Sequence, residues 1–214
     1  MKKIEEEYRI RFDKVLQRIA ISLTSHLQDY LSGEPHIDRV MARAKAVDSF
    51  VEKARRESAD REPKYTEPFR QIQDQIGARI IAFYKSDVAR LDQFVMKYFT
   101  PIEIKNHVPE RDEEFSYFGR HFVLRLPTDV IAPDMDRSLV PDFFELQVKT
   151  LFQHAWSEAE HDLGFKPGAE PLTSDQKRRL AFTSAQAWGA DHIFDELFRE
   201  RSATAFSSAA PAIH

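Results

Sequence analysis

Two acidic side chains lie beside apolar segments, where a site for phosphate chemistry could hold a metal ion. Asp74 precedes the apolar segment 80–83, and Arg79 lies between them. Farther along, three polar residues alternate with apolar ones and would share one face of a strand: Glu145, Gln147 and Lys149. Carboxylates bind Mg²⁺ next to phosphates and can accept the proton of an attacking hydroxyl. The residues indicate phosphoryl transfer, although a helix-capping Asp, a surface Arg and a half-exposed strand would also explain them.

A run of hydrogen-bond donors lies upstream of these acids. We predict a helix over 44–56, and steps of four place Lys45, Ser49 and Lys53 on one face of it, with Arg43 just ahead. Three donors near a helix start are suited to bind phosphate groups, because the free backbone amides there also favour anions. A solvated basic face is the alternative interpretation of the same spacing.

Aromatic and histidine residues form a third group. Tyr117 and His121 lie at the start of an expected strand, and one expected helix carries Trp156, Glu160 and His161. Tyr and Trp rings can stack on nucleobases, although both also pack in protein cores. The chain contains no Gly-x-x-x-x-Gly-Lys segment and no kinase-type glycine-rich loop. The P-loop and protein-kinase classes of nucleotide site are therefore excluded.

These residues need a scaffold of helices and strands, which the hydrophobic periodicity outlines. Helices are expected over residues 1–31, 44–56, 87–99, 150–161 and 174–201. Extended segments are expected over residues 37–41, 76–84, 102–105, 121–126 and 143–148. Their order predicts an α+β fold in which a mixed β-sheet of about five strands is flanked by helices, with helical extensions at both ends. A single domain would span 1–201, followed by a flexible tail at 202–214.

The composition limits the class of protein further. Hydrophobic residues make up 42% of the 214 residues and charged residues 31%, which is enough to form a core. The 31 Lys and Arg against 35 Asp and Glu argue against a generic nucleic-acid or membrane-surface binder. Without cysteine there are no disulfides, thiolate zinc sites or Cys nucleophiles. No apolar run approaches the roughly 20 residues of a membrane span, and the N-terminus lacks a signal-peptide core, so we expect a cytoplasmic protein.

The separate patterns occur in one order along the chain. They are Arg-x-Lys-x-x-x-Ser-x-x-x-Lys from Arg43, Asp-x-x-Gly-x-Arg from Asp74, Tyr-x-x-x-His from Tyr117, and Glu-Leu-Gln-Val-Lys-Thr from Glu145, with Trp and Glu-His on the next helix. In this order they resemble the synthetase domain of the RelA/SpoT family. The resemblance covers about 37–166, is densest over 144–166, and is closest to the small, single-domain members of that family.

This resemblance implies a (p)ppGpp synthetase, which transfers the β,γ-pyrophosphate of ATP to the 3′-hydroxyl of GDP or GTP with Mg²⁺ as cofactor. By position, Asp74 and Glu145 would be the catalytic residues that bind Mg²⁺, and Glu145 would also be the base. The residues implied for ATP are Arg43, Lys45, Ser49, Lys53 and Arg79. The residues implied for the acceptor are Tyr117, His121, Gln147, Lys149 and His161, with His154 as a further phosphate or supporting contact.

The acceptor side departs from the family pattern. Members of the family usually carry Lys-x-Asn-Gly-Tyr before the stacking tyrosine, whereas this chain has Glu-Glu-Phe-Ser-Tyr over 113–117, preceded by Glu-Arg-Asp over 110–112. Each like charge near a phosphate costs on the order of 1 kcal/mol close to a surface. We therefore expect GDP to be used better than GTP.

Three functions remain open on the sequence. The first is a small alarmone synthetase, which would bind ATP and GDP or GTP and could form a homo-oligomer such as a tetramer. The second is a toxic family member that modifies adenosine nucleotides or the tRNA 3′-CCA end, with tRNA or an antitoxin as partner. The third is a non-catalytic nucleotide-sensing module, which the presence of both Asp74 and Glu145 disfavours. None of the three requires a membrane.

Overall fold

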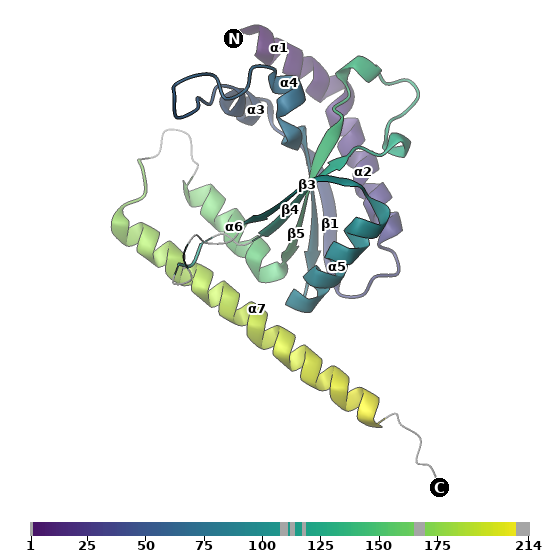
Figure 1. Ribbon diagram of the computed structural model, residues 1–214, viewed down its shortest axis with the longest axis vertical. Helices are drawn as coiled ribbons and strands as arrows, with labels where there is room; N and C mark the ends of the chain where they lie inside the picture. Colours follow the sequence, from purple (N-terminus) through teal and green to yellow (C-terminus); the bar gives the residue numbers. More distant parts are fainter. Residues whose placement is uncertain (1, 108–110, 112–113, 117–118, 165–169, 209–214) are drawn as a thin grey trace.

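A five-stranded sheet forms the centre of the molecule (Figure 1). The computed structural model describes residues 2–107, 111, 114–116, 119–164 and 170–208. The strands are β1 (Ile37–Ala44), β2 (Ile76–Ala82), β3 (Pro101–His107), β4 (Gly119–Arg125) and β5 (Phe143–Thr150). They lie in the order β1-β2-β5-β4-β3; β2 and β5 are parallel and the other pairs antiparallel. The predicted mixed sheet of about five strands is confirmed.

Helices surround this sheet and extend from both ends of the domain. They are α1 (Lys2–Arg11), α2 (Gln17–Tyr30), α3 (Val47–Ala54), α4 (Pro68–Gln71), α5 (Lys85–Tyr98), α6 (Leu151–Gly164) and α7 (Ser174–Ser208). A π-helical segment, Phe12–Leu16, joins α1 to α2, so the two form one continuous helix as predicted for 1–31. Short 3₁₀ segments lie at Gln73–Gln75, Thr128–Val130 and Arg137–Leu139. Among the helices of the described residues, none is long and apolar enough to cross a membrane.

The two faces of the sheet differ because side chains alternate along each strand. In β5, Phe144, Leu146 and Val148 are fully buried, and they point away from the polar residues between them. Figure 1 shows α2 and α5 on the apolar face and α6 on the opposite face. Burial of each large apolar side chain contributes about 1.5–3 kcal/mol to folding. The apolar face therefore stabilises the domain, and the opposite face is left for polar groups.

Two expectations about the first helix after β1 are wrong. β1 continues to Ala44 and α3 begins at Val47, so Arg43 lies on a strand and Lys45 lies in the junction. The antiparallel pairing of β1 with β2 extends to Ala44, and the Lys45 amide then donates to the carbonyl of Gln75 at 2.9 Å. This cross-strand hydrogen bonding outweighs the helical periodicity of the segment.

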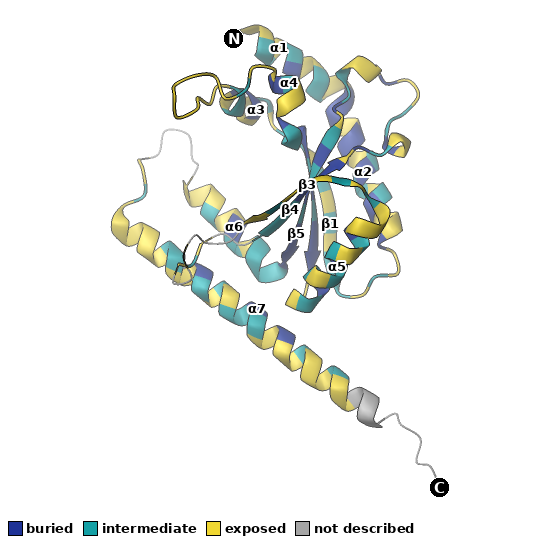
Figure 2. Cartoon of the chain, in the orientation of Figure 1, coloured by how far each residue is buried: buried dark blue, intermediate teal, exposed yellow. Residues whose placement is uncertain are grey.

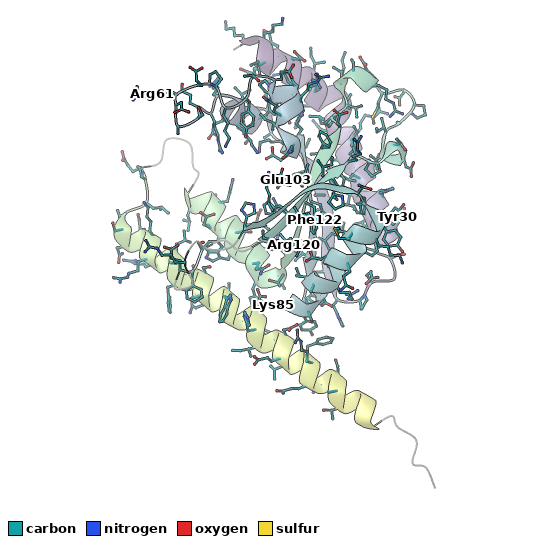
Figure 3. The ribbon with its side chains drawn as sticks, in the orientation of Figure 1. Tyr30, Arg61, Lys85, Glu103, Arg120 and Phe122 are labelled. Atoms are coloured by element: carbon teal, nitrogen blue, oxygen red, sulfur yellow. The ribbon has the colours of Figure 1, made fainter. Side chains whose placement is uncertain are left out.

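The final helix is longer than expected, since α7 continues to Ser208 rather than ending at 201. It extends well past the body of the sheet and carries many exposed residues (Figures 1 and 2). Two hydrogen bonds join α7 to the rest of the domain: Asp191 accepts from the hydroxyl of Thr150 on β5 at 2.7 Å, and Asp195 accepts from the amide of Ser86 on α5 at 2.8 Å. The Nζ atom of Lys85, labelled in Figure 3, lies 2.7 Å from the Nε2 atom of His192 on α7. The C-terminal helix is thus attached to the ends of β5 and α5.

Candidate active site

The polar face of the sheet brings together residues from all five strands. Gly77 on β2 lies between Arg43 on β1 and Glu145 on β5 in the paired register. A side chain placed on Gly77 would meet no atom within 4 Å, so the space above this point is open. The next row of the sheet contains Arg79, Gln147, His121 and Lys105, in that order. These two rows form the floor of the candidate site.

Asp74 lies just before β2 and is held by two lysines. Its Oδ2 atom is 2.9 Å from the Nζ atom of Lys45 and 3.0 Å from that of Lys53. Burial alone would raise the pKa of Asp74, but the two lysines outweigh burial and lower it, so the carboxylate is ionised. The two lysines converge on this carboxylate, but the predicted shared helical face is wrong, because Lys45 approaches from the end of β1 and only Lys53 lies on α3.

The N-terminal helix fixes the position of this charged cluster. The buried hydroxyl of Tyr8 donates to the carbonyl of Lys45 at 2.9 Å. The ring of Tyr8 stacks on Phe50 of α3, with 3.7 Å between the ring centroids, and α3 carries Lys53. The sequence identified Tyr8 only as part of an apolar stripe, because nothing local shows where its hydroxyl group points.

Glu145 lies beside two polar neighbours on the same face. Its Oε1 atom accepts a hydrogen bond from Gln147 Nε2 at 2.6 Å and lies 3.3 Å from His121 Nδ1. Burial, reinforced by nearby His107, lowers the pKa of His121 to about 3. His121 is therefore neutral near pH 7, and an Nδ1–H tautomer can donate to the carboxylate. This arrangement orients the Glu145 carboxylate.

Asp74 and Glu145 are better suited to hold Mg²⁺ together with substrate phosphates than to form a metal site made entirely of protein ligands. The Oδ1 atom of Asp74 is buried and has no hydrogen-bond partner among the described residues. Gly77, three residues after Asp74, is the register partner of Glu145, so the two acids lie at the same end of adjacent parallel strands. In the described part of the chain, no three acidic, His or Cys residues are grouped as metal ligands. Mg²⁺ is commonly held by one or two carboxylates together with substrate phosphates.

Helix α6 adds a second layer of polar contacts above the sheet. Arg79 Nη1 is 2.5 Å from Glu158 Oε1, and the buried Lys149 Nζ donates to the hydroxyl of Ser157 at 3.1 Å. Burial, and after it the charge of Arg79, lowers the pKa of Lys149 to about 7. The sequence prediction missed Ser157 and Glu158. A polar stripe at helical spacing (154, 157, 158 and 161) was the signal that could have found them.

A cavity of about 420 Å³ opens on the other side of α6, toward α7. Its lining includes Phe115, Trp156, Leu172 and Leu180 as apolar groups and Glu160 and Lys177 as charged ones. The indole nitrogen of Trp156 donates to the carbonyl of Leu180 and to Thr183, which ties α6 to α7 at the edge of the cavity. Its size and its mixed aromatic and charged lining suit a nucleobase.

The segment before β4 is attached to the same wall. Ser116 accepts a hydrogen bond from the Ser184 hydroxyl at 2.8 Å, and Phe115 makes an edge contact with Trp188 at 5.9 Å. Tyr117, the residue implied for base stacking, lies outside the described residues, as do Glu110, Asp112 and Glu113. The described part of this segment thus borders the cavity.

The structure groups most, but not all, of the predicted site residues. Those on or beside the polar sheet face are Arg43, Lys45, Lys53, Asp74, Arg79, His121, Glu145, Gln147 and Lys149. Ser49 is exposed in the first turn of α3, and no hydrogen bond to its side chain is recorded within the described residues. His161 is exposed near the end of α6. Their roles in binding ATP and the acceptor stay predictions.

Comparison with known proteins identifies relatives of this arrangement. The family model described as a region found in RelA / SpoT proteins matches residues 42–170. The GTP pyrophosphokinase YjbM of Bacillus subtilis (strain 168) is 26% identical over 196 residues, covering 90% of this chain and 87% of that protein.

Solved structures agree on the fold. Small alarmone synthetase 1 from Bacillus subtilis bound to its product pppGpp has a TM-score of 0.68 and 24% identity, covering 92% of this chain and 97% of that one. The same enzyme bound to AMPCPP has a TM-score of 0.59 and 23% identity, covering 92% of this chain and 94% of that one. At this level of identity the likeness shows a shared fold over nearly the whole length.

Proposed function

Because the chain belongs to the RelA/SpoT family, we propose that it is a (p)ppGpp synthetase, which transfers the β,γ-pyrophosphate of ATP to the 3′-hydroxyl of GDP or GTP. The observation that carries this proposal is the pairing of Asp74 with Lys45 and Lys53 beside Glu145, at one end of two parallel strands. Curated and solved relatives that cover almost the whole chain are named as GTP pyrophosphokinase and small alarmone synthetase.

The chain's own residues divide the work of donor binding. Lys45 and Lys53 bind the ATP phosphates, and Ser49 adds a hydroxyl donor from α3, the helix that carries Lys53. Arg43 and Arg79 bind toward the adenine end. Asp74 and Glu145 would hold Mg²⁺, which would supply charge neutralisation for the phosphates. Most of the barrier reduction in phosphoryl transfer comes from such positioning and charge neutralisation.

Glu145 also accepts the proton of the attacking hydroxyl. A bond forms between the 3′-oxygen of the acceptor and the β-phosphorus of ATP, while the bond from the bridging oxygen to that phosphorus breaks. AMP leaves with the bridging oxygen, and the product is ppGpp from GDP or pppGpp from GTP. Gln147 and His121, which lie against Glu145, orient the carboxylate for this step.

The acceptor binds over β4 and β5, with its base toward the cavity between α6 and α7. His121, Gln147 and Lys149 lie on the polar face of β4 and β5, the cavity has aromatic walls, and Tyr117 follows directly in sequence after the Phe115–Ser116 segment that borders the cavity. The acidic segment 110–114 disfavours additional phosphate charge, so GDP is the better acceptor. His161, near the end of α6, would be a further contact to the acceptor.

The same acidic segment is the reason to keep a second acceptor class. Where members of the family usually carry a lysine that can bind the phosphates of a nucleoside diphosphate, this chain has Glu113. An adenosine nucleotide or the 3′ end of tRNA would then be the acceptor, and an antitoxin would be a further partner. The net charge of −4 weakens the tRNA version. The exposed apolar residues of α7, Phe182, Ile193 and Leu197 among them, are compatible with a homo-oligomer such as a tetramer.

A product assay tests the function directly. Purified protein is incubated with ATP labelled in its β- and γ-phosphates and with GDP, GTP, AMP or deacylated tRNA, each with Mg²⁺ or with excess EDTA. We expect label on GDP and, more slowly, on GTP, and no product in EDTA. Label on AMP or on tRNA alone would replace the alarmone proposal with the second one. No transfer to any acceptor, with ATP-analogue binding retained, would favour a nucleotide sensor.

A further inference from the structure

Helix α6 presents a polar stripe to the polar face of the sheet. Ser157 accepts from Lys149 at 3.1 Å and donates to the carbonyl of His154 at 3.0 Å, and Glu158 accepts from Arg79 at 2.5 Å. These contacts come from one side of α6, while Trp156 and Glu160 line the cavity on the other side. The helix therefore separates two environments, and Glu158 lies on the side of the donor subsite.

Two arginines and a histidine act on the Glu158 carboxylate: Arg79, Arg43 and His154. Burial alone would raise the pKa of Glu158, but Arg79 outweighs it, and His154 and Arg43 lower the pKa further. The Glu158 side chain is nevertheless 46% exposed, against 16% for Arg79. A half-exposed ion pair contributes little to folding stability. The contact is therefore more significant for the orientation of Arg79 than for the fold.

The ion pair determines which part of Arg79 remains available. The carboxylate engages a terminal nitrogen at the edge of the guanidinium group, whereas stacking on a base uses its flat face. The cation–ring contacts among the described residues involve Arg11, Lys64, Lys97 and Arg120, so no such contact covers Arg79. Arg79 also lies two residues beyond Gly77 along β2. Measured along the strand, it is about 7 Å farther than Gly77 from the end at which the two lysines pair with Asp74.

We propose that Glu158 is a positioning residue of the donor subsite, which holds Arg79 by its edge so that the guanidinium face stacks on the adenine of ATP. In this role Glu158 directs Arg79 to the base and away from the phosphates. The inference rests on the proposed function, since it takes the donor to be a purine nucleoside triphosphate. It adds a residue from α6 to a subsite otherwise built from β1, α3 and β2.

Calorimetry with two ligands separates binding of the base from binding of the phosphates. The ligands are AMPCPP, an ATP analogue, and inorganic tripolyphosphate, each with Mg²⁺. We expect Glu158→Ala to weaken AMPCPP roughly tenfold, as expected for a lost cation–π contact, while tripolyphosphate affinity stays within about twofold. Glu158→Gln keeps an oxygen acceptor and should recover part of the loss. Asp162→Asn, which removes one negative charge from the same helix, is the control and should leave both affinities unchanged.

Each other outcome overturns the inference. If both ligands bind more tightly to Glu158→Ala, Glu158 competes with phosphate for Arg79. If both bind equally weakly, the substitution has damaged the subsite as a whole, and if neither changes, the ion pair has no role in binding. Failure of the wild-type protein to bind AMPCPP at all would instead count against the proposed function. Circular dichroism of each variant checks that the fold is retained.

Discussion

The donor half of the proposed site comes from one stretch of chain, whereas the acceptor half is assembled from several distant segments. Residues 43–79 supply all five donor-side residues, from β1, the junction after it, α3, the 3₁₀ segment Gln73–Gln75 and β2: Arg43, Lys45, Lys53, Asp74 and Arg79. The cavity on the acceptor side is lined by residues from 115–116, 156–164 and 171–181. A site made of local segments can be inferred from spacing, but a site made of distant ones depends on how α6 and α7 pack.

The two halves also differ in how they handle charge without a ligand. In the donor half the side chains of Lys45, Lys53 and Asp74 are only 19–24% exposed, and they neutralise one another. In the acceptor half a hollow remains, with aromatic walls and two opposite charges, Glu160 and Lys177. The donor half is therefore organised before ATP arrives, whereas the acceptor half is a shaped space whose lining selects the acceptor.

Glu145 lies between the two halves, so its loss should have the largest effect. Glu145→Gln should reduce pyrophosphate transfer by roughly 100-fold or more, because an amide cannot accept the proton or bind Mg²⁺ well. Initial rates with GDP as acceptor measure this. Glu103→Gln is the matched control. Glu103, labelled in Figure 3, lies on the same sheet face but on the edge strand β3, where it is paired with Lys105. Activity of Glu145→Gln within a few-fold of wild type would remove Glu145 from the reaction.

The second largest effect should be confined to the donor half. Lys45→Ala or Lys53→Ala should raise the KM for ATP by about tenfold. Each substitution removes one charge-assisted contact, which contributes about 1.5–3 kcal/mol, and a tenfold change corresponds to the lower end of that range. The KM for GDP should change little. Lys64→Ala, at an exposed lysine in the loop before α4, serves as the control. Unchanged AMPCPP affinity in both variants would support the solvated basic face instead.

A cavity-filling substitution should affect only the acceptor half. Ala181→Met places a longer side chain into the cavity between α6 and α7. We expect the KM for GDP to rise several-fold, on the order of 1 kcal/mol, while AMPCPP affinity is unchanged. Ala203→Met, at an exposed position on the same helix, should leave both ligands unaffected. If Ala181→Met weakens AMPCPP and leaves GDP unchanged, the cavity belongs to the donor.

The smallest effect should come from pH, and it tests the half to which Lys149 belongs. Burial lowers the pKa of Lys149 to about 7, so the ammonium form prevails below pH 7 and is lost as the pH rises above it. GDP affinity should therefore fall a few-fold between about pH 6 and pH 8, whereas AMPCPP affinity should not. The Lys149→Arg variant keeps its positive charge over this pH range. Any change in its GDP affinity therefore measures the titration of the GDP phosphates alone. A fall for AMPCPP alone would move Lys149 to the donor half.

Much of the fold follows from local patterns in the sequence. The alternation of polar and apolar residues over 143–148 predicted β5, and the apolar density over 76–84 predicted β2. Apolar stripes at helical spacing predicted α1–α2, α5 and α6. The ends of these elements differ from the predicted ends by a few residues. These predictions succeed because alternation and helical spacing depend only on which neighbours along the chain must be buried. The boundary at Ala44 was wrong because pairing with β2 extends the strand.

For the site, the sequence determined which side chains are present, and the tertiary structure decided which of them meet. Lys45, Lys53 and Asp74 were recognisable because family-like spacing marks them, yet only the β1–β2 pairing brings Lys45 to the carboxylate. The contacts of Tyr8 and Glu158 each join residues far apart in the chain, so a local pattern can mark the residue but does not identify its partner. The strand order β1-β2-β5-β4-β3 places Arg79, Gln147 and His121 in one row. Register and helix docking are properties of the packed chain as a whole, so no segment alone determines them.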